Sequence, residues 1–292
     1  MRRAMDKRLS ILTLLCLAAP CCTREVPADL PDVEPGLQTV LSADIESLLL
    51  GEERRTWPDG ACIGVFGSDR GDNEKYLLRR ADAGLSSALF YGPAVGGDVV
   101  AAYYPYRADY SAAAGEMNVQ VDAAQAFDPE ATASGQFLRY CPQAYAFLAD
   151  GALKFRYPCG MLAVQLALDE DLTVLSVACS SASRALAGIG TVDADGLALA
   201  DGALQEVVLS CGGGVPSRDA AGNITPFYLV LAPGCYDDLS VRIALDGEEP
   251  ATFQTGRIEI PRVDASRFTL ASVIVRGGGP EGFEPETVHF DE

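Results

Sequence analysis

Histidine is nearly absent from this chain, whose 292 residues include a single one, His289, close to the C-terminus. Nucleophilic systems built on Ser-His-Asp or Cys-His need an imidazole beside the nucleophile, and many zinc sites need several histidines. The sequence also lacks the short motifs typical of α/β-hydrolases, zinc proteases and nucleotide-binding loops. We therefore expect no enzyme, no cofactor and no resident metal.

Positive charge is scarce as well. Only 22 Lys and Arg stand against 41 Asp and Glu, which gives a formal net charge of -19. Such a chain repels phosphate backbones and anionic lipid headgroups, so nucleic-acid binding is not expected. A hydrolase with paired carboxylates would have only acidic residues of unmarked spacing in its favour.

The chain has no apolar run of membrane-spanning length near its start. The run Leu9–Pro20 is 12 residues long and follows four basic residues, as in a secretory signal. It ends at Cys21-Cys22 and resembles the lipobox of bacterial lipoproteins, which makes residues 1–21 the signal peptide and Cys22 the lipidation site. An ordinary cleaved signal peptide is the alternative. Removal of residues 1–21 takes away four basic residues and Asp6, so the mature charge becomes -22.

Residues 22–36 form an acidic, proline-rich segment. Pro27, Pro31 and Pro35 recur at regular spacing with acidic residues between them. Regular proline removes backbone donors and favours extended chain, so we expect a semi-rigid tether between a lipid anchor and a folded body.

The chain has nine cysteines, which divide between the N-terminal signal region and the expected folded body. Removal of the signal and lipidation of Cys22 account for three, which leaves Cys62, Cys141, Cys159, Cys179, Cys211 and Cys235. Six cysteines in an exported chain permit three disulfides in 15 connectivities. Several lie within apolar runs, where cysteine also serves as a small core residue. Disulfides and buried free thiols both remain open from sequence.

From residue 37 onward the pattern predicts an all-β protein. Short apolar runs alternate with Gly, Pro, Asp and Asn at spacings typical of a β-sandwich. We place a domain boundary near Asp150-Gly151, giving domains 37–152 and 153–292. Met161–Leu168 is apolar throughout, which predicts a strand covered on both faces. Ser180–Ala187 is expected to form one helical turn, Asp193–Gly196 a tight turn, and Gly212–Gly214 a loose turn.

Specific residues carry a family resemblance. The segment W-P-D-G-A-C-I-G-V-F (Trp57–Phe66), followed by A-A-Y-Y-P-Y (Ala101–Tyr106), resembles the N-terminal signature of the fimbrillin-like proteins of Bacteroidetes. In the second half, Leu153–Leu166 and T-P-F-Y-L-V-L-A-P-G (Thr225–Gly234) follow in the order of that family. Cys62 departs from the pattern, and so does Phe155–Pro158, where many members have a histidine.

The resemblance implies two tandem transthyretin-like β-sandwich domains in an outer-membrane lipoprotein. It implies a structural or adhesive subunit of a surface fimbria, whether stalk, tip or anchor, that joins other subunits by strand exchange. Adhesion to a host or bacterial surface protein or glycan belongs to the same expectation. The alternative is a surface glycan-binding lipoprotein of a polysaccharide-uptake system.

In stalk subunits of the family, a protease that cuts after arginine removes the first strand. The matching position here is Arg54-Arg55, which follows the strand-like run Leu37–Ile45. A solvated charged turn beside Glu52 and Glu53 is the plain alternative.

Two further features have more than one interpretation. Tyr103, Tyr104, Tyr106 and Tyr110 could stack on sugars, although packing within the core or at a strand edge is the favoured reading. Val288–Phe290 could be a donor strand for a neighbouring subunit, although a frayed terminus is favoured.

Overall fold

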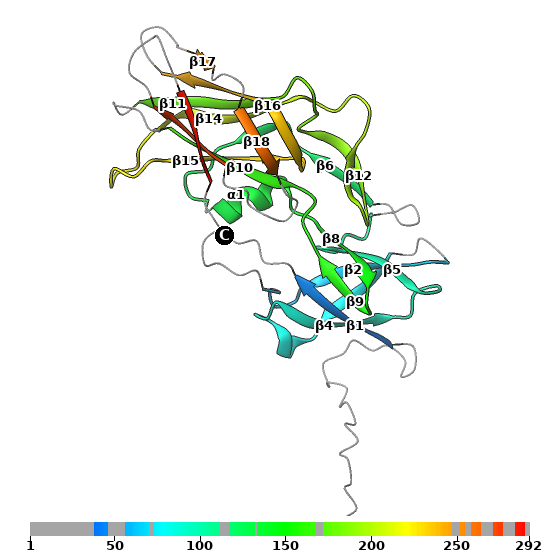
Figure 1. Ribbon diagram of the computed structural model, residues 1–292. Coiled ribbons are helices and arrows are strands. Elements are labelled where there is room, and N and C mark those ends of the chain that lie inside the picture. Colours follow the sequence, from blue (N-terminus) through cyan, green and yellow to red (C-terminus); the bar gives the residue numbers. More distant parts are fainter. Residues whose placement is uncertain are drawn as a thin grey trace, which may run out of the picture. The chain divides into compact units, whose positions relative to one another are not determined.

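In the computed structural model, most of the described regular structure is β-strand (Figure 1). The described residues are 38–45, 56–69, 73–110, 117–131, 133–166 and 172–246, with the backbone alone of 252–254, 258–263, 271–276 and 284–289. The chain divides into residues 1–30 and 31–292, and every described residue belongs to the second unit. The expected all-β class is confirmed.

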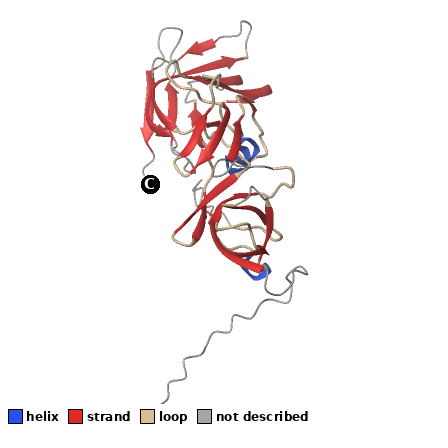
Figure 2. Cartoon of the chain, turned by 90° about the vertical axis from the view of Figure 1, so that its right-hand side faces the viewer, coloured by secondary structure: helices blue, strands red, loops and turns tan. Residues whose placement is uncertain are grey.

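Seven strands form a closed barrel, whose curved wall is visible in Figure 2. Each strand is antiparallel to its neighbours, except that β1 and β9 are parallel where the barrel closes. This closure joins two edges that an open sheet would leave apart. The order around the barrel is β1 (Gln38–Ile45), β4 (Ser87–Pro93), β3 (Glu74–Leu78), β2 (Cys62–Gly67), β5 (Val99–Tyr104), β8 (Ala144–Ala149) and β9 (Ala152–Phe155).

The other strands form three sheets. One has four strands in the order β15 (Pro226–Leu231), β10 (Gly160–Gln165), β19 (Ala271–Arg276) and β20 (Glu284–His289). A second runs β17 (Thr252–Gln254), β16 (Gly234–Leu245), β11 (Thr173–Ser180), β14 (Glu206–Pro216) and β7 (Ala124–Ala126), with β18 (Ile258–Val263) also paired to β16. The third contains β13 (Gly196–Leu199), β12 (Gly188–Asp193) and β6 (Met117–Val121).

Strand pairing crosses the middle of the sequence. β6 and β7 precede residue 152, but β6 pairs with β12 and β7 pairs with β14. β9 extends past residue 152 and belongs to the barrel. The boundary between residues 152 and 153 stays a prediction, and the sheets show that strands from the first half complete sheets of the second.

The buried strand pattern follows the sequence. Met161–Val164 of β10 are all buried, and β10 is paired on both sides, as the apolar run predicts. In β16, Val241, Ile243 and Leu245 are buried, whereas Arg242 between them is exposed. The alternation of apolar and polar residues thus places one face of this strand in the core.

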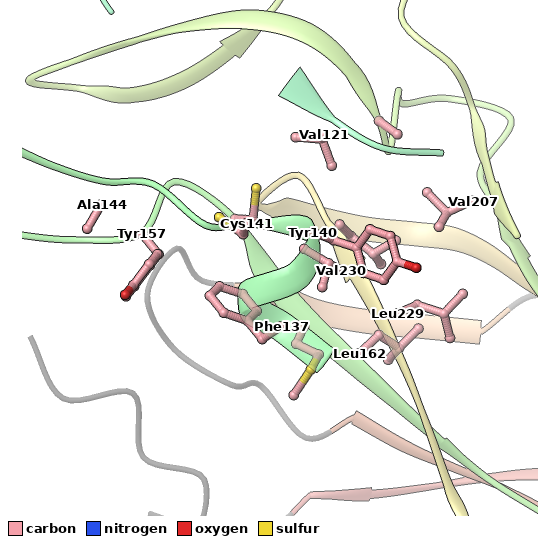
Figure 3. Packing of buried hydrophobic residues seen from close by; sticks show 14 of the residues in the cluster. Val121, Phe137, Tyr140, Cys141, Ala144, Tyr157, Leu162, Val207, Leu229 and Val230 are labelled. Carbon is pink, nitrogen blue, oxygen red and sulfur yellow. The ribbon is translucent and has the colours of Figure 1, made fainter. Parts of the chain in front are cut away.

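A short helix was missed by the sequence analysis. Helix α1 (Ala133–Tyr140) contributes Phe137 and Tyr140 to the core and contacts β15. Figure 3 shows these two side chains among buried residues that include Leu162, Leu229 and Val230. Its sequence, A-S-G-Q-F-L-R-Y, contains Gly and Ser and has only two turns, so its helical period was too short to recognise.

Three local predictions were wrong. Ser180–Ala187 forms the end of β11 followed by bends, because Asp238 accepts hydrogen bonds from the Ser181 hydroxyl and the Ser183 backbone N–H. Gly212–Gly214 lies inside β14, near the register irregularity between β14 and β11. At the C-terminus, β20 pairs with β19 over six residues instead of fraying. The tight turn at Asp193–Gly196 is confirmed and connects β12 to β13.

Candidate functional site: the β1 position of the barrel

Strand β1 closes the barrel. It pairs antiparallel with β4 from Gln38 to Asp44, and parallel with β9 only from Ala43 to Ile45. The β4 side has seven residue pairs and the β9 side has three. Because a parallel pair of this length supplies few hydrogen bonds, the contact with β9 is the weaker side of the strand.

The inward face of β1 is apolar and small. Ala43 is fully buried and Ile45 is 4% exposed, whereas Val40 on the other face is 38% exposed. Leu41 is partly buried and packs against the same core. Removal of β1 would therefore expose an apolar groove between β4 and β9, with unpaired backbone groups along both walls.

The single tryptophan contacts both strands that flank β1 in the barrel. Trp57 is fully buried and makes edge-on contacts with Phe90 and Phe155, at centroid distances of 4.9 and 5.2 Å. Phe90 belongs to β4 and Phe155 to β9, the two neighbours of β1. Tyr104 completes the aromatic cluster at 5.2 Å. The indole therefore reports on the two strands that β1 joins.

A buried carboxylate supports the start of β4. Asp82 lies in the 3-10 turn η1 (Arg80–Asp82), is 3% exposed, and accepts hydrogen bonds from the Arg79 guanidinium and from the Leu89 N–H. Burial alone would raise the pKa of Asp82, but these hydrogen bonds and the charge of Arg79 outweigh it, so the pKa of Asp82 is lowered. The charged Asp82 carboxylate thereby fixes the chain that leads into β4.

A tyrosine fixes the far end of β4. The Tyr76 hydroxyl donates to the Pro93 carbonyl oxygen at 2.6 Å, and burial raises the pKa of Tyr76. The Tyr76 ring lies so close to Gly92 that a Cβ atom there would approach a ring carbon to 2.4 Å. Gly92 is opposite Thr39 of β1. Asp82 and Tyr76 therefore hold the two ends of β4, the strand that pairs with β1.

The proposed lipidation and processing residues lie outside the described residues. Cys22 precedes the first described residue, Gln38, and Arg54 and Arg55 fall between the end of β1 at Ile45 and the first described residue after it, Thr56. Both remain predictions. The structure adds that β1 is the only described strand that precedes Arg54-Arg55.

Two of the tyrosines considered for sugar stacking, Tyr103 and Tyr110, pack against each other. Tyr103 is fully buried, and its hydroxyl donates to the Asn73 side-chain oxygen or the Arg107 carbonyl oxygen, at 3.0 and 2.7 Å. The Tyr110 ring packs on Tyr103 at 4.3 Å between centroids. The favoured reading is confirmed for this pair, and the two rings give the glycan-binding alternative no support.

Two other kinds of site are absent from the described residues. They contain no group of three or more His, Cys, Asp or Glu residues placed to hold a metal ion. Within the same residues, no helix has the length and hydrophobicity needed to cross a membrane. The residues that hold β4 against β1 belong to no recognisable sequence motif. They are Asp82, Tyr76 and Gly92.

Comparison with solved structures identifies the fold. A candidate cell adhesion protein from Bacteroides ovatus aligns over 86% of this chain and 95% of its own, with a TM-score of 0.52 and 12% identity. A second, from Bacteroides uniformis, aligns over 87% and 98%, with a TM-score of 0.51 and 15% identity. No family model and no curated protein matches the sequence.

The tip fimbrial protein Mfa3 from Porphyromonas gingivalis, with a C-terminal truncation, is also similar. It aligns over 88% of this chain and 99% of its own, with a TM-score of 0.41 and 11% identity, too low to support an argument. The structural neighbours are thus candidate cell adhesion proteins and a fimbrial tip protein. The two Bacteroides structures, whose TM-scores exceed 0.5, agree in fold with the resemblance to fimbrillin-like proteins.

Proposed function

We propose that this chain is a structural or adhesive subunit of a bacterial surface fimbria that assembles by strand exchange at the β1 position. One observation carries the proposal: β1 closes the barrel, and it is the only described strand before Arg54-Arg55. A cut in that segment would break the covalent link between β1 and the rest of the barrel. A strand from a neighbouring subunit would then pair with β4 and β9.

The remaining parts of the proposal concern anchoring and architecture. Acylation of Cys22 would place the subunit on the outer membrane, with residues 22–36 as the tether. The halves 37–152 and 153–292 would be two transthyretin-like domains, with β6 and β7 joining the sheets of the second. β20 is the candidate donor strand, because its only partner among the described strands is β19.

The test treats the full-length chain with an Arg-specific protease. Mass spectrometry locates the cut, Trp57 fluorescence follows the loss of β1 from the barrel, and size-exclusion chromatography detects oligomers. We expect a cut after Arg54 or Arg55, a change in Trp57 emission and the appearance of oligomers. The matched control is Arg54→Lys together with Arg55→Lys, which keeps the charge but removes the cleavage site.

Two outcomes would reject the assembly mechanism. One is resistance of the Arg54-Arg55 segment in the folded protein, and the other is a cut that releases β1 without forming oligomers. Anchoring is tested separately by palmitate labelling of the chain in cells, with Cys22→Ala as the control that should lose the label.

A further inference from the structure

Cys141 and Cys159 are brought together by the hairpin of β8 and β9. Residues 149 and 152 are paired, as are 148 and 153, and Tyr145 and Arg156 form a bridge with N–H···O distances of 2.7 and 2.8 Å. Continuing this register toward the open end of the hairpin places residue 142 opposite Cys159. Cys141 is the adjacent residue, so the hairpin itself places the two cysteines within reach of each other.

The two thiols are in contact and shielded from solvent. The Cys159 thiol forms a side-chain hydrogen bond with that of Cys141, and the two residues are 0% and 2% exposed. Cys141 directly follows α1 (Figure 3), and its N–H donates to the Phe137 carbonyl oxygen at 2.8 Å. Cys159 immediately precedes β10. Both residues are thus fixed by neighbouring backbone structure.

The other four cysteines of the folded body lack this arrangement. Cys179 of β11 is opposite Val207 of β14, four residues before Cys211 in the same strand. Cys235 is exposed, and the thiol of Cys62 donates to the Gly60 carbonyl oxygen at 3.3 Å. Among the six cysteines of the folded body, Cys141 and Cys159 are therefore the pair that the backbone register favours.

We propose that Cys141 and Cys159 form a disulfide bond in the exported protein. The proposal rests on the exported location given under the proposed function. Each sulfur loses its hydrogen and the S–S bond forms. Two electrons and two protons pass to the disulfide of an exported dithiol–disulfide oxidoreductase, or to glutathione disulfide in vitro, which becomes two thiols.

The bond would form during folding. The contact with Cys141, together with burial, raises the pKa of the Cys159 thiol well above its usual value. Since the thiolate is the reactive form, exchange within the closed core is slow. The finished bond would fasten the base of the hairpin whose second strand, β9, pairs with β1.

The first arm of the test refolds the reduced full-length chain with reduced and oxidised glutathione. Free thiols are alkylated in denaturant without reductant, and the chain is digested with trypsin and a Glu-specific protease. Cleavage after Glu170 is needed because Cys159 and Cys179 share one tryptic peptide. We expect peptide 140–154 linked to peptide 157–170, and a Tm about 5–10 °C above that of the reduced protein.

The variants Cys141→Ala and Cys159→Ala should each lose the link and leave the partner cysteine alkylated. Cys179→Ala is the matched control, because Cys179 is also fully buried, and it should keep the link. Alkylation of both Cys141 and Cys159 in the refolded wild-type chain overturns the proposal, as does a bond from either one to a different cysteine.

The second arm isolates the chain from cells and labels the cell surface with a membrane-impermeant biotin ester. A biotinylated chain with both thiols free overturns the disulfide and leaves the proposed location standing. An unlabelled chain whose refolded form carries the link overturns the proposed location and supports the pairing.

Discussion

At the residue scale, Asp82 connects charge to the shape of the barrel. Its carboxylate holds both Arg79 and the N–H of Leu89, with only 3% of the residue exposed. Asp82→Asn should lower the free energy of unfolding by about 2–3 kcal/mol at pH 7, since it removes the charge from these hydrogen bonds.

The pH dependence follows from the lowered pKa of Asp82. A carboxyl whose pKa is lower in the folded state stabilises the fold above its unfolded pKa, roughly pH 4, and loses this contribution as pH falls through the folded value. Urea unfolding of wild type and Asp82→Asn at pH 7 and pH 3 measures this difference. The gap between them should shrink at pH 3, and a constant gap would contradict the assignment.

Gly64 is needed because an aromatic ring covers it. A Cβ atom at Gly64 would lie 2.1 Å from a ring carbon of Tyr103, the residue opposite it on β5. Tyr103 cannot move aside easily, because its hydroxyl is hydrogen-bonded and it is fully buried. Gly64→Ala should therefore cost about 1–3 kcal/mol of stability by urea unfolding.

Gly213→Ala is the matched control for this prediction. No atom lies within 4 Å of a Cβ placed at Gly213, so the change should stay within about 0.5 kcal/mol. Equal effects of the two substitutions would show that the Tyr103 ring does not decide the result.

Individual residues could be interpreted from sequence only where their environment is local. The turn at Asp193 was predictable, because the Asp193 carboxylate oxygen accepts from N–H groups two and three positions later. Asp82 was not predictable as a buried residue, since Leu89 is seven positions away and burial depends on the whole barrel. Gly64 likewise depends on Tyr103, which lies on another strand.

At the element scale, a side chain takes the place of a strand beside β15. The Gln125 amide donates to the Val230 carbonyl oxygen at 2.8 Å, and its oxygen accepts from the Val230 N–H at 3.0 Å. The same amide nitrogen donates to the Asp122 carbonyl oxygen at 2.9 Å. A buried glutamine thus satisfies the backbone of an otherwise open strand edge.

Gln125→Leu should destabilise the protein by about 3 kcal/mol, because it leaves buried backbone groups of Val230 without partners. Hydrogen exchange measured by mass spectrometry should become faster in β15. The control is Gln120→Leu, since Gln120 is exposed and its amide donates to the Asp122 side chain at 2.8 Å instead of to a backbone group of β15. Unchanged protection of β15 in Gln125→Leu would contradict this role.

Strands were predictable where apolar residues were continuous or alternating, as in β10 and β16. Strand β3 (E-K-Y-L-L) is hard to predict from sequence, because two charged residues begin it and only Tyr76 is buried. Pairing was harder to predict than strand existence. Nothing local in β6 or β9 specifies that β6 pairs with β12, or that β9 closes the barrel against β1.

At the scale of the whole molecule, negative charge opposes self-association. The net charge is -19, and it would be -22 if residues 1–21 are removed as predicted, so copies of the chain repel one another at long range. Oligomer formation after protease treatment should therefore be faster at about 0.3 M NaCl than at 0.01 M, because salt screens the repulsion.

Light scattering over time measures this salt dependence, with the extent of cleavage checked at each salt concentration. The uncleaved Arg54→Lys, Arg55→Lys variant is the control and should stay monomeric throughout. Faster assembly at low salt would show that oppositely charged surfaces, instead of strand insertion, drive the association.

The pairing of β1 with β9, which closes the barrel, also constrains the order of folding. Ala43 pairs with Leu153, about 110 residues further along the chain, whereas Leu41 pairs with Phe90 after about 50. Closing the longer loop costs more entropy, and the pairing of β1 with β9 cannot be completed until residue 155 is available. The sheet from β1 to β5 is therefore expected to form first, as an open, curved wall. A chain that emerges N-terminus first would hold β1 by one edge until the last barrel strand arrives.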